Sequence, residues 1–142
     1  MHVIQFPICR AWFFLDENRE NVIRKWLNEN DVSDADRVSL QALLDIYEGS
    51  GFHAIVASTV DLGEGFHALR SSRKGGIEPC PVFCAGPTGE NEITFLAGAR
   101  WDSKAKTVRP TYAVGVAKEN LEELLKDRQR RVRERVARSF AR

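Results

Sequence analysis

The sequence has little of what marks a secreted or membrane protein. It contains three cysteines in 142 residues, an odd and sparse set that argues against a disulfide framework and fits a reducing compartment. No apolar run approaches the roughly 20 residues that are needed to cross a bilayer. The first residues lack the basic start and the small-residue cleavage site of a signal peptide. We therefore expect a cytoplasmic protein with no membrane partner.

The cysteines are also badly spaced for a metal ion. Cys80 and Cys84 lie in the segment CPVFC, and in a strand four steps of about 3.3 Å separate them by roughly 13 Å. That distance is too long for both thiols to bind one zinc ion. His53 and His67 add no familiar ligand spacing. We expect ordinary buried thiols, no metal site and no other cofactor.

The chain also lacks internal repeats, low-complexity tracts and linkers rich in proline or serine. Its 142 residues, 43% hydrophobic and 29% charged, match one ordinary soluble domain with a real core. We therefore expect residues 1–142 to form a single domain. The oligomeric state stays open.

Acidic and basic residues are distributed unevenly, because the first half of the chain has few basic residues and the second half has an excess of them. Residues 1–69 hold 5 Lys and Arg against 11 Asp and Glu, a net charge of −6. Residues 70–142 hold 16 against 9, a net charge of +7, so the whole chain carries only +1. Any contact with nucleic acid is therefore expected in the second half. The alternative is a cationic helix that merely faces solvent.

Apolar spacing predicts a strand and a helical hairpin near the start. The run from Trp12 to Leu15 indicates a buried strand, and a period of 3.6 residues then predicts a helix from about Arg19 to Asn28. Ser33 is expected to be the N-cap of a second helix, with Asp36 completing a capping box. Glycines end this helix. Its inward face is expected to carry Val38, Ala42, Leu43, Ile46 and Tyr47.

The residue pattern in the middle of the chain predicts strands. AIVASTV fits either a short strand or an extended loop, and FHALRS fits a strand. Pro79 and Pro81 remove two N–H groups from one side of the next segment, which is therefore expected at a sheet edge or regular only from Cys80 to Ala85. EITFLAGAR, residues 92–100, gives the clearest strand pattern.

An apolar stripe predicts a long helix from about Tyr112 to Phe140. The part DRQRRVRER holds five arginines in nine residues, so the last turns are expected to project from the body or to pack on a partner. The element order is then β-α-α-β-β-β-α. This order predicts an α+β fold, with a small antiparallel sheet, a helical hairpin and a long basic C-terminal helix.

Four segments stand out when the predicted elements are taken in order. They are FFLDENRENVIRKWL at 13–27, LQALLDIYEGSG at 40–51, GFHALRSSRKGGI at 65–77 and EITFLAGAR at 92–100. None of them is diagnostic alone, but their order and spacing over about residues 10–135 resemble the RelE/ParE toxin superfamily, in particular its HigB-like, phage Gp49-like branch.

The resemblance implies a RelE-like fold and the toxin component of a bacterial type II toxin–antitoxin system. Such toxins are held inactive by an antitoxin, here expected to be of the helix-turn-helix type, and the RelE and HigB types cleave mRNA on the ribosome. The implied reaction needs no metal, because the ribose 2′-hydroxyl attacks the adjacent phosphate. Cationic side chains stabilise the charge that develops on that phosphate.

The resemblance also implies a set of site residues. Arg100 is the expected stabiliser of the transition state, Arg70 a second catalytic cation, and Tyr112 an acid or base, a role for which Lys104 and Lys106 are alternatives. The structural alternatives are an Arg70 ion pair with Glu64, a core position for Tyr112, and a Trp101 that covers the sheet edge. The residues expected to bind RNA, with Trp101 stacking on a base, are Arg73, Lys74, Trp101, Lys104, Lys106 and Arg109.

One place departs from the family pattern. Glu78 and Pro79 stand where family members usually carry an aromatic residue and an arginine. This difference favours a second hypothesis, a non-enzymatic protein of the same fold that inhibits gyrase as ParE does or that binds nucleic acid or an antitoxin. A third hypothesis is a phage or bacterial accessory protein whose basic helix serves assembly.

Overall fold

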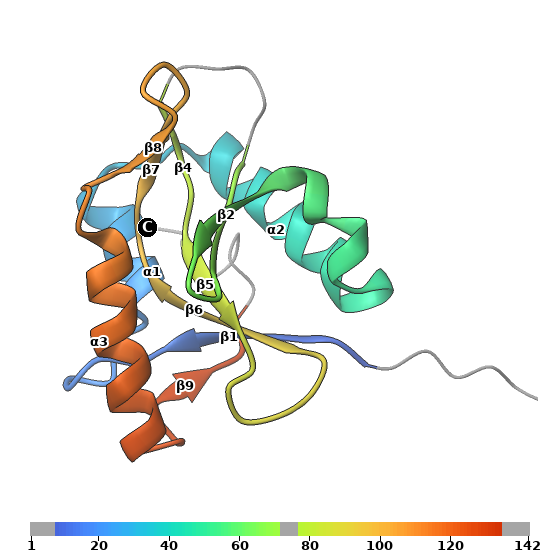
Figure 1. Cartoon of the computed structure of the whole chain (residues 1–142), viewed down its shortest axis with the longest axis vertical. Coiled ribbons are helices and arrows are strands. Elements are labelled where there is room, and N and C mark those ends of the chain that lie inside the picture. Colours follow the sequence, from blue (N-terminus) through green and yellow to red (C-terminus); the bar gives the residue numbers. More distant parts are fainter. Residues whose placement is uncertain (1–7, 72–76, 135–142) are drawn as a thin grey trace, which may run out of the picture.

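The structure is a computed structural model that describes residues 8–71 and 77–134. Figure 1 shows how its helices and strands follow one another along the chain. Between α2 and β2 lie two short 3-10 turns, η1 (Phe52–Ala54) and η2 (Val56–Ser58). The helices and strands are β1 (Arg10–Phe14), α1 (Val22–Glu29), α2 (Asp34–Ser50), β2 (Thr59–Gly63), β3 (Phe66–Leu69), β4 (Ile77–Pro79), β5 (Val82–Ala85), β6 (Glu92–Ala97), β7 (Arg100–Asp102), β8 (Thr107–Arg109), α3 (Ala113–Lys126) and β9 (Arg131–Val132).

The strands form two sheets. The larger sheet has the order β2-β3-β5-β6-β1-β9, and the smaller sheet has the order β4-β7-β8. The α+β class is therefore correct, and the described strand pairs are antiparallel as expected, with one exception. Strand β1 pairs with β6 in parallel, with Phe13 opposite Phe95. The two helices after β1 carry the chain to the far edge of the sheet, and the strands that follow return until β6 runs beside β1 in the same direction.

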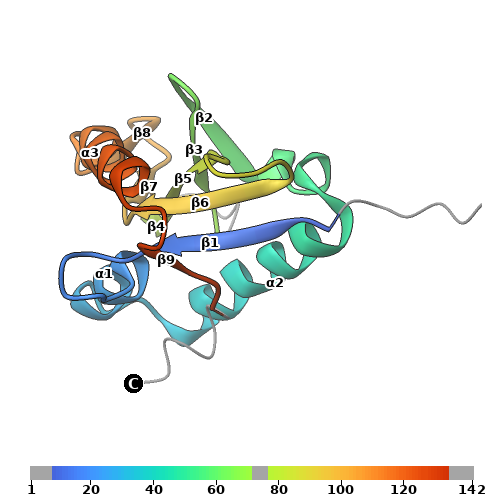
Figure 2. The same ribbon diagram turned by 90° about the horizontal axis from the view of Figure 1, so that it is seen from below.

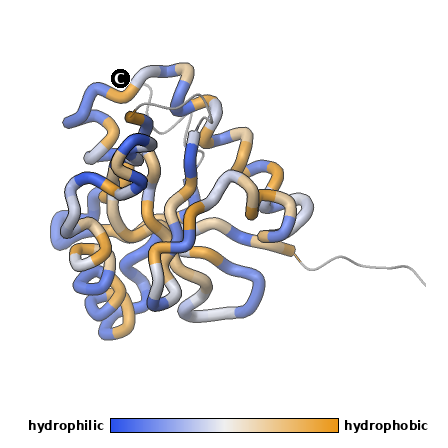
Figure 3. Tube along the Cα trace, turned by 45° about the horizontal axis from the view of Figure 1, so that its top comes forward, coloured by the Kyte–Doolittle hydropathy of each residue, from blue (hydrophilic) through white to orange (hydrophobic). Residues whose placement is uncertain are grey.

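Helices cover both faces of the larger sheet (Figure 2). On one face, α1 and α2 pack over a core that contains Phe13, Phe83 and Phe95, where the Phe13 and Phe95 rings stack with their centroids 5.2 Å apart. On the other face, small side chains of α3 let the helix approach a core that contains Phe14 and Leu96. Hydropathy along the chain follows these layers, since the central strands are mainly hydrophobic while the helices alternate (Figure 3). Burying each large apolar side chain contributes about 1.5–3 kcal/mol.

The N-caps of the helical hairpin explain where its helices begin. The Asn21 side chain accepts hydrogen bonds from the N–H groups of Ile23 (3.0 Å) and Arg24 (3.2 Å), so α1 begins at Val22, three residues later than expected. Ser33 accepts from the Asp36 N–H at 3.2 Å, which confirms the predicted cap of α2. Side-chain caps of this kind satisfy N–H groups that have no partner inside the helix.

The predicted inward face of α2 is wrong by about one residue. Val38 is 59% exposed and Ile46 45% exposed, and Ala42 also faces solvent, whereas Leu43 is half-buried and Tyr47 is buried as expected. The buried positions of this helix are Arg37, Leu40, Gln41, Leu44 and Tyr47.

Arg37 explains this rotation of α2. Its side chain is only 1% exposed, and it donates to the carbonyl oxygens of Val32 (2.9 Å) and Leu27 (3.1 Å) and to the side chain of Asn28 (2.9 Å). These bonds satisfy acceptors at and beyond the C-terminal end of α1, where a positive charge is also favourable. A buried cation therefore joins the two helices of the hairpin.

The two prolines lie on either side of a crossing between the two sheets. Pro79 ends β4, an edge strand of the smaller sheet, so the expected edge position is correct there. Strand β5 lies inside the larger sheet, between β3 and β6, and its regular structure runs from Val82 rather than Cys80 to Ala85. Between the prolines, the Cys80 N–H donates to the Ala99 carbonyl at 2.8 Å, and the Pro81 carbonyl accepts from Leu69 at 2.9 Å. The segment crosses from the smaller sheet to the larger sheet at this point.

The long C-terminal helix is the largest error of the sequence prediction. Helix α3 ends at Lys126, and a turn leads to β9, which pairs antiparallel with β1. The Arg130 guanidinium lies 4.8 Å from the Phe14 ring centroid and donates to the Leu15 carbonyl, so this part of the basic segment packs on the body. The predicted helix beyond Glu134 lies outside the described residues. Within the described part of the chain, no helix is long and apolar enough to cross a membrane.

Candidate functional site

The β7–β8 hairpin carries most of the described site candidates. Arg100 faces Arg109 in the strand register, and Trp101 faces Val108. Because side chains alternate along a strand, Arg100 and Arg109 share one face of the small sheet, while Trp101 lies on the other with Glu78, its neighbour in β4. Lys104 and Lys106 lie in the turn between the strands and are exposed. We call this region, residues 100–109, the hairpin site.

Asp102 holds the turn of the hairpin site together. Its carboxylate accepts hydrogen bonds from the N–H groups of Lys104 (3.0 Å) and Ala105 (3.2 Å) and forms an ion pair with Arg109 at 2.9 Å. The Ala105 N–H, then the Lys104 N–H and Arg109, hold the pKa of Asp102 below its usual value, against an opposing effect of burial. The carboxylate therefore stays ionised, and the two lysine side chains extend from a fixed turn.

Arg100 is anchored on the helical hairpin. Its guanidinium donates to the Asn30 carbonyl at 2.8 Å and lies 5.6 Å from the centroid of the Trp26 ring. Asn30 follows the last residue of α1, where carbonyl groups lack helical partners and favour a cation. The arginine is half-buried, and its position is fixed by both contacts.

Arg70 is paired with an acid. Its Nε forms an ion pair with the Glu78 carboxylate, and its guanidinium lies 5.7 Å from the Trp101 ring centroid. The Arg70 side chain is 22% exposed and that of Glu78 only 6%. The expected alternative partner, Glu64, instead forms an ion pair with Lys118. The residue that departs from the family pattern thus neutralises one of the two expected catalytic arginines.

The expected stacking residue is buried. Trp101 is 9% exposed and belongs to the core between the sheet and α3, so the structural alternative in which it covers the sheet is the better description. Tyr112, in contrast, is 69% exposed, so its core alternative is wrong. It directly precedes α3 and makes no side-chain capping bond.

Tyr112 and Trp26 line one groove of about 330 Å³ between α1 and α3. Gly98, Pro110 and Asn120 also line it. Because Arg100 lies over the Trp26 ring, this groove adjoins the hairpin site. Trp26 was not among the expected site residues. Its place beside the cations depends on the contact between α1 and Gly98, for which the sequence carries no local signal.

The remaining candidates are placed as follows. Arg73 and Lys74 lie outside the described residues. All three cysteines are buried and none forms a disulfide. Burial raises the pKa of Cys80 to about 12, and the negative charge of Glu78 raises it further while the positive charge of Arg70 lowers it. Burial alone raises the pKa of Cys84 to about 11. Among residues 8–71 and 77–134, no group of three or more His, Cys, Asp or Glu side chains is placed to hold a metal ion.

Comparison of the chain with protein-family models and with curated proteins finds no match.

Proposed function

We propose that this chain is the toxin component of a bacterial type II toxin–antitoxin system and that it cleaves ribosome-bound mRNA without a metal. The observation that carries the proposal is the hairpin site, where exposed cations adjoin an aromatic groove. Single-stranded RNA is bound by this combination, because cations follow its phosphates and rings stack on its bases. The order of strand, helical hairpin, strands and helix supports the RelE/ParE type.

The phosphate contacts come from the turn and from β8. Lys104 and Lys106 are exposed, and the Arg109 side chain is 58% exposed although it is paired with Asp102. Each phosphate that a cation neutralises on single-stranded RNA adds about −0.7 to the slope of log affinity against log salt. The base contact comes from Tyr112 and Trp26, which take the role that Trp101 was expected to play.

Arg100 is the residue best placed for the chemistry. A guanidinium has five N–H donors, of which one bonds to the Asn30 carbonyl, so the arginine is held in position while others face the phosphate. The 2′-oxygen attacks the adjacent phosphorus, the bond to the 5′-oxygen breaks, and a 2′,3′-cyclic phosphate remains. Tyr112 exchanges the protons that the 2′-oxygen loses and the 5′-oxygen gains. The reaction consumes no further reagent.

A second candidate function is favoured by the Arg70–Glu78 ion pair. Because Glu78 neutralises Arg70, the site presents fewer uncompensated cations to a phosphate than the resemblance implies. The candidate is a protein of the same type that binds RNA or an antitoxin, or that inhibits gyrase, without cleaving RNA.

Induced expression in a bacterium separates these functions. The wild type is expected to arrest growth and to produce codon-phased cuts in mRNA, while Arg100→Ala and Tyr112→Phe reduce cleavage at least 100-fold. Lys126→Ala is the control, because Lys126 is an exposed cation at the far end of α3. Arrest without cuts would establish the second candidate, and absence of arrest with soluble, folded protein would overturn both toxin functions.

Binding of single-stranded RNA gives an independent test of the site. The double variant Lys104→Ala/Lys106→Ala is expected to reduce the salt slope by about 1.4, which corresponds to two lost phosphate contacts. An unchanged slope would place the RNA elsewhere on the protein.

A further inference from the structure

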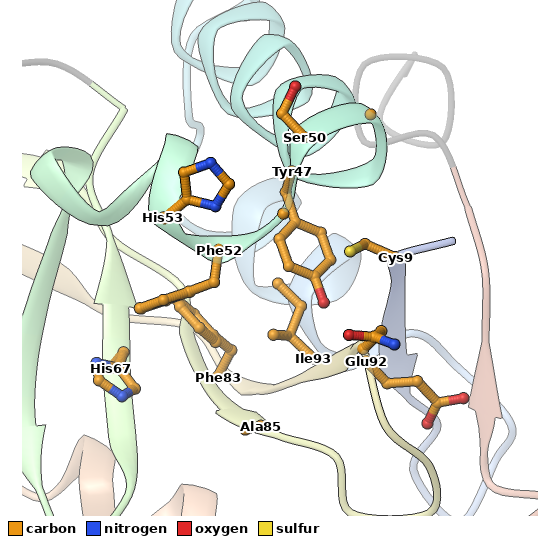
Figure 4. A pocket seen from close by; sticks show the side chains of 13 residues that line it. Cys9, Tyr47, Ser50, Phe52, His53, His67, Phe83, Ala85, Glu92 and Ile93 are labelled. Carbon is orange, nitrogen blue, oxygen red and sulfur yellow. The ribbon is translucent and has the colours of Figure 1, made fainter. Parts of the chain in front are cut away.

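A second cavity lies at the opposite end of β6 from the hairpin site. It has a volume of about 520 Å³ and lies between the C-terminal end of α2, η1 and the strands β3, β5 and β6. Glu92, the first residue of β6, lines it, whereas the hairpin site follows the last residue of that strand. Figure 4 shows its lining side chains.

The walls of this cavity are aromatic. The His67 and Phe83 rings stack with centroids 5.5 Å apart, and the Phe52 ring meets both of them edge-on at 5.4 and 6.2 Å. Figure 4 shows the Tyr47 ring beside these rings and His53 above them. Ring faces and edges arranged in this way suit a flat aromatic ligand, since offset-stacked and edge-to-face pairs are the favourable geometries.

Polar groups lie at one end of the cavity. In Figure 4 the Tyr47 hydroxyl points toward the side where Glu92 and Ile93 lie. Burial, with the charges of Cys9, Glu92 and Glu48 adding, raises the pKa of Tyr47, so its hydroxyl stays protonated. Tyr47 lines the cavity, and a protonated hydroxyl can both donate to and accept from a ligand.

Glu92 supplies a fixed acceptor. Burial opposes its ionisation, but the hydrogen bond and charge of Arg131, with a further bond from Thr88, outweigh burial and lower its pKa. These partners hold the carboxylate at 2.9 and 3.2 Å. None of the described residues that line the cavity is a lysine or an arginine. Arg131, the ion-pair partner of Glu92, is not among these lining residues, so the carboxylate is the charged group nearer to the cavity. A ligand with an N–H donor is therefore favoured over an anion.

The other cavities differ in character. One of about 590 Å³, beside α1, is lined mainly by charged and amide side chains such as Arg24, Lys25 and Glu29. The groove of about 330 Å³ belongs to the proposed RNA site. Small-molecule sites typically combine a volume of about 300–1,000 Å³ with apolar walls and a few convergent polar groups. The cavity at Tyr47 has this combination.

We propose that the cavity at Tyr47 binds a small, flat, nitrogen-bearing aromatic molecule that is neutral or cationic. The ring inserts among Phe52, His67 and Phe83, and its N–H group faces the Tyr47 hydroxyl at the end of the cavity that Glu92 lines. This binding site is separate from the proposed RNA site and does not depend on it.

Three indoles with the same ring test the proposal. Indole is neutral, tryptamine is a cation and indole-3-acetate is an anion at pH 8. Each is titrated into the full-length, isotope-labelled protein while backbone amide NMR shifts are followed. We expect indole and tryptamine to shift Gly51, His67 and Glu92 in a saturable manner, and indole-3-acetate to bind at least tenfold more weakly.

Two variants tie the binding to the cavity. Phe52→Ala removes a half-buried wall residue and is expected to weaken indole binding about tenfold. Glu92→Gln keeps the shape but removes the charge, and it is expected to reduce the preference for tryptamine over indole-3-acetate to less than threefold. Val38→Ala, an exposed position on α2, is the control with unchanged binding.

Three outcomes would overturn the proposal. They are equal or tighter binding of indole-3-acetate by the wild type, shifts that concentrate around Trp26 and Tyr112 instead of the cavity, and absence of saturable shifts with any of the three indoles. If Phe52→Ala failed to fold, the titration of the wild type with the three indoles and the Glu92→Gln variant would still test the proposal.

Discussion

The ring of Trp26 packs directly on the backbone of Gly98, so that a Cβ atom at Gly98 would lie 2.1 Å from Trp26 Cγ and 2.6 Å from its Cβ. These atoms are at the root of the side chain and cannot move aside without moving α1. The contact joins α1 to the chain just after β6, beside Arg100. It positions both the groove and the stacked cation of the proposed RNA site.

Gly98→Ala is therefore expected to destabilise the protein by about 3 kcal/mol, because overpacking a tight contact forces backbone shifts. Urea unfolding at pH 7 measures this change. Gly115→Ala is the matched control, since no atom lies within 4 Å of a Cβ placed there. Gly115 is the third residue of α3, and alanine is the better helix former, so the control is expected to stabilise by up to about 1 kcal/mol. Equal effects of the two changes would contradict the role assigned to Gly98.

The Arg70–Glu78 ion pair is expected to respond unequally to loss of its two members. Glu78 is the more buried partner, and within the described residues its second carboxylate oxygen has no hydrogen-bond partner. Arg70→Met leaves that carboxylate uncompensated and is expected to cost about 3 kcal/mol, near the lower end for a broken buried pair. Glu78→Leu leaves an arginine that reaches solvent and is expected to cost less.

The double variant Arg70→Met/Glu78→Leu is the control for this pair. It is expected to lie within about 1 kcal/mol of the wild type, because apolar replacement of a whole buried pair is often neutral. Urea unfolding of all four proteins completes the double-mutant cycle. Strictly additive losses would show that the two side chains act independently.

The sequence predicts the start of a helix when a local hydrogen bond fixes it, but it predicts the buried face less well because tertiary contacts decide that face. The Ser33 cap is a local hydrogen bond, and the sequence alone indicated it. The inward face of α2 was not predictable, because apolar residues occupy both of its neighbouring stripes. Arg37 was not among the residues expected on that face, and its burial is explained by the carbonyl groups of Leu27 and Val32, which accept hydrogen bonds from its guanidinium.

The C-terminal segment shows the same limit. Its spacing continues a helical period past Lys126, so the predicted helix was too long. The chain instead turns and places Arg130 on the Phe14 ring while β9 pairs with β1. Backbone hydrogen bonds to a distant strand outweigh a weak helical preference, and no nearby residue indicates which distant strand is available.

The surroundings of the candidate site residues could be predicted only in part. The resemblance implied Arg100 and the two hairpin lysines as site residues, and these remain predictions. The burial of Trp101 was not predictable, because alternation along a strand of three residues gives either face. The pairing of Arg70 with Glu78 was missed, since the two side chains meet only through the β4–β7 contact and the end of β3.

The two cysteines of the CPVFC segment are expected to be unreactive in the folded protein. With pKa values of about 12 for Cys80 and about 11 for Cys84, thiolate fractions at pH 8 are on the order of 10⁻⁴ and 10⁻³, and only the thiolate reacts. In a Cys9→Ser variant, labelling by an aromatic disulfide at pH 8 should be at least 100-fold slower in buffer than in denaturing urea. Rapid labelling of either cysteine in buffer would contradict the burial assigned to this segment.

The stability of the protein is expected to depend on pH through Asp102, which holds the turn of the hairpin site. Its pKa is lowered in the folded protein, so its contribution to stability is fully present above the ordinary aspartate pKa of about 3.9 and is lost as the pH falls through the lower, folded value. Asp102→Asn should therefore lower the urea midpoint at pH 7, and the difference from the wild type should shrink between pH 4 and pH 2.

Asp61→Asn is the matched control for this pH dependence. Asp61 accepts one backbone N–H bond, from Gly63 at 2.8 Å, and is exposed on β2, an edge strand of the larger sheet. It shares neither the ion pair nor the paired backbone bonds that Asp102 makes. Its substitution should change the midpoint less at pH 7. Equal losses at pH 7 for Asp102→Asn and Asp61→Asn, or an Asp102 difference that grew in acid, would show that the turn does not depend on the ionised Asp102 carboxylate. Another contact would then have to hold Lys104 and Lys106 in the positions that the proposed RNA site requires.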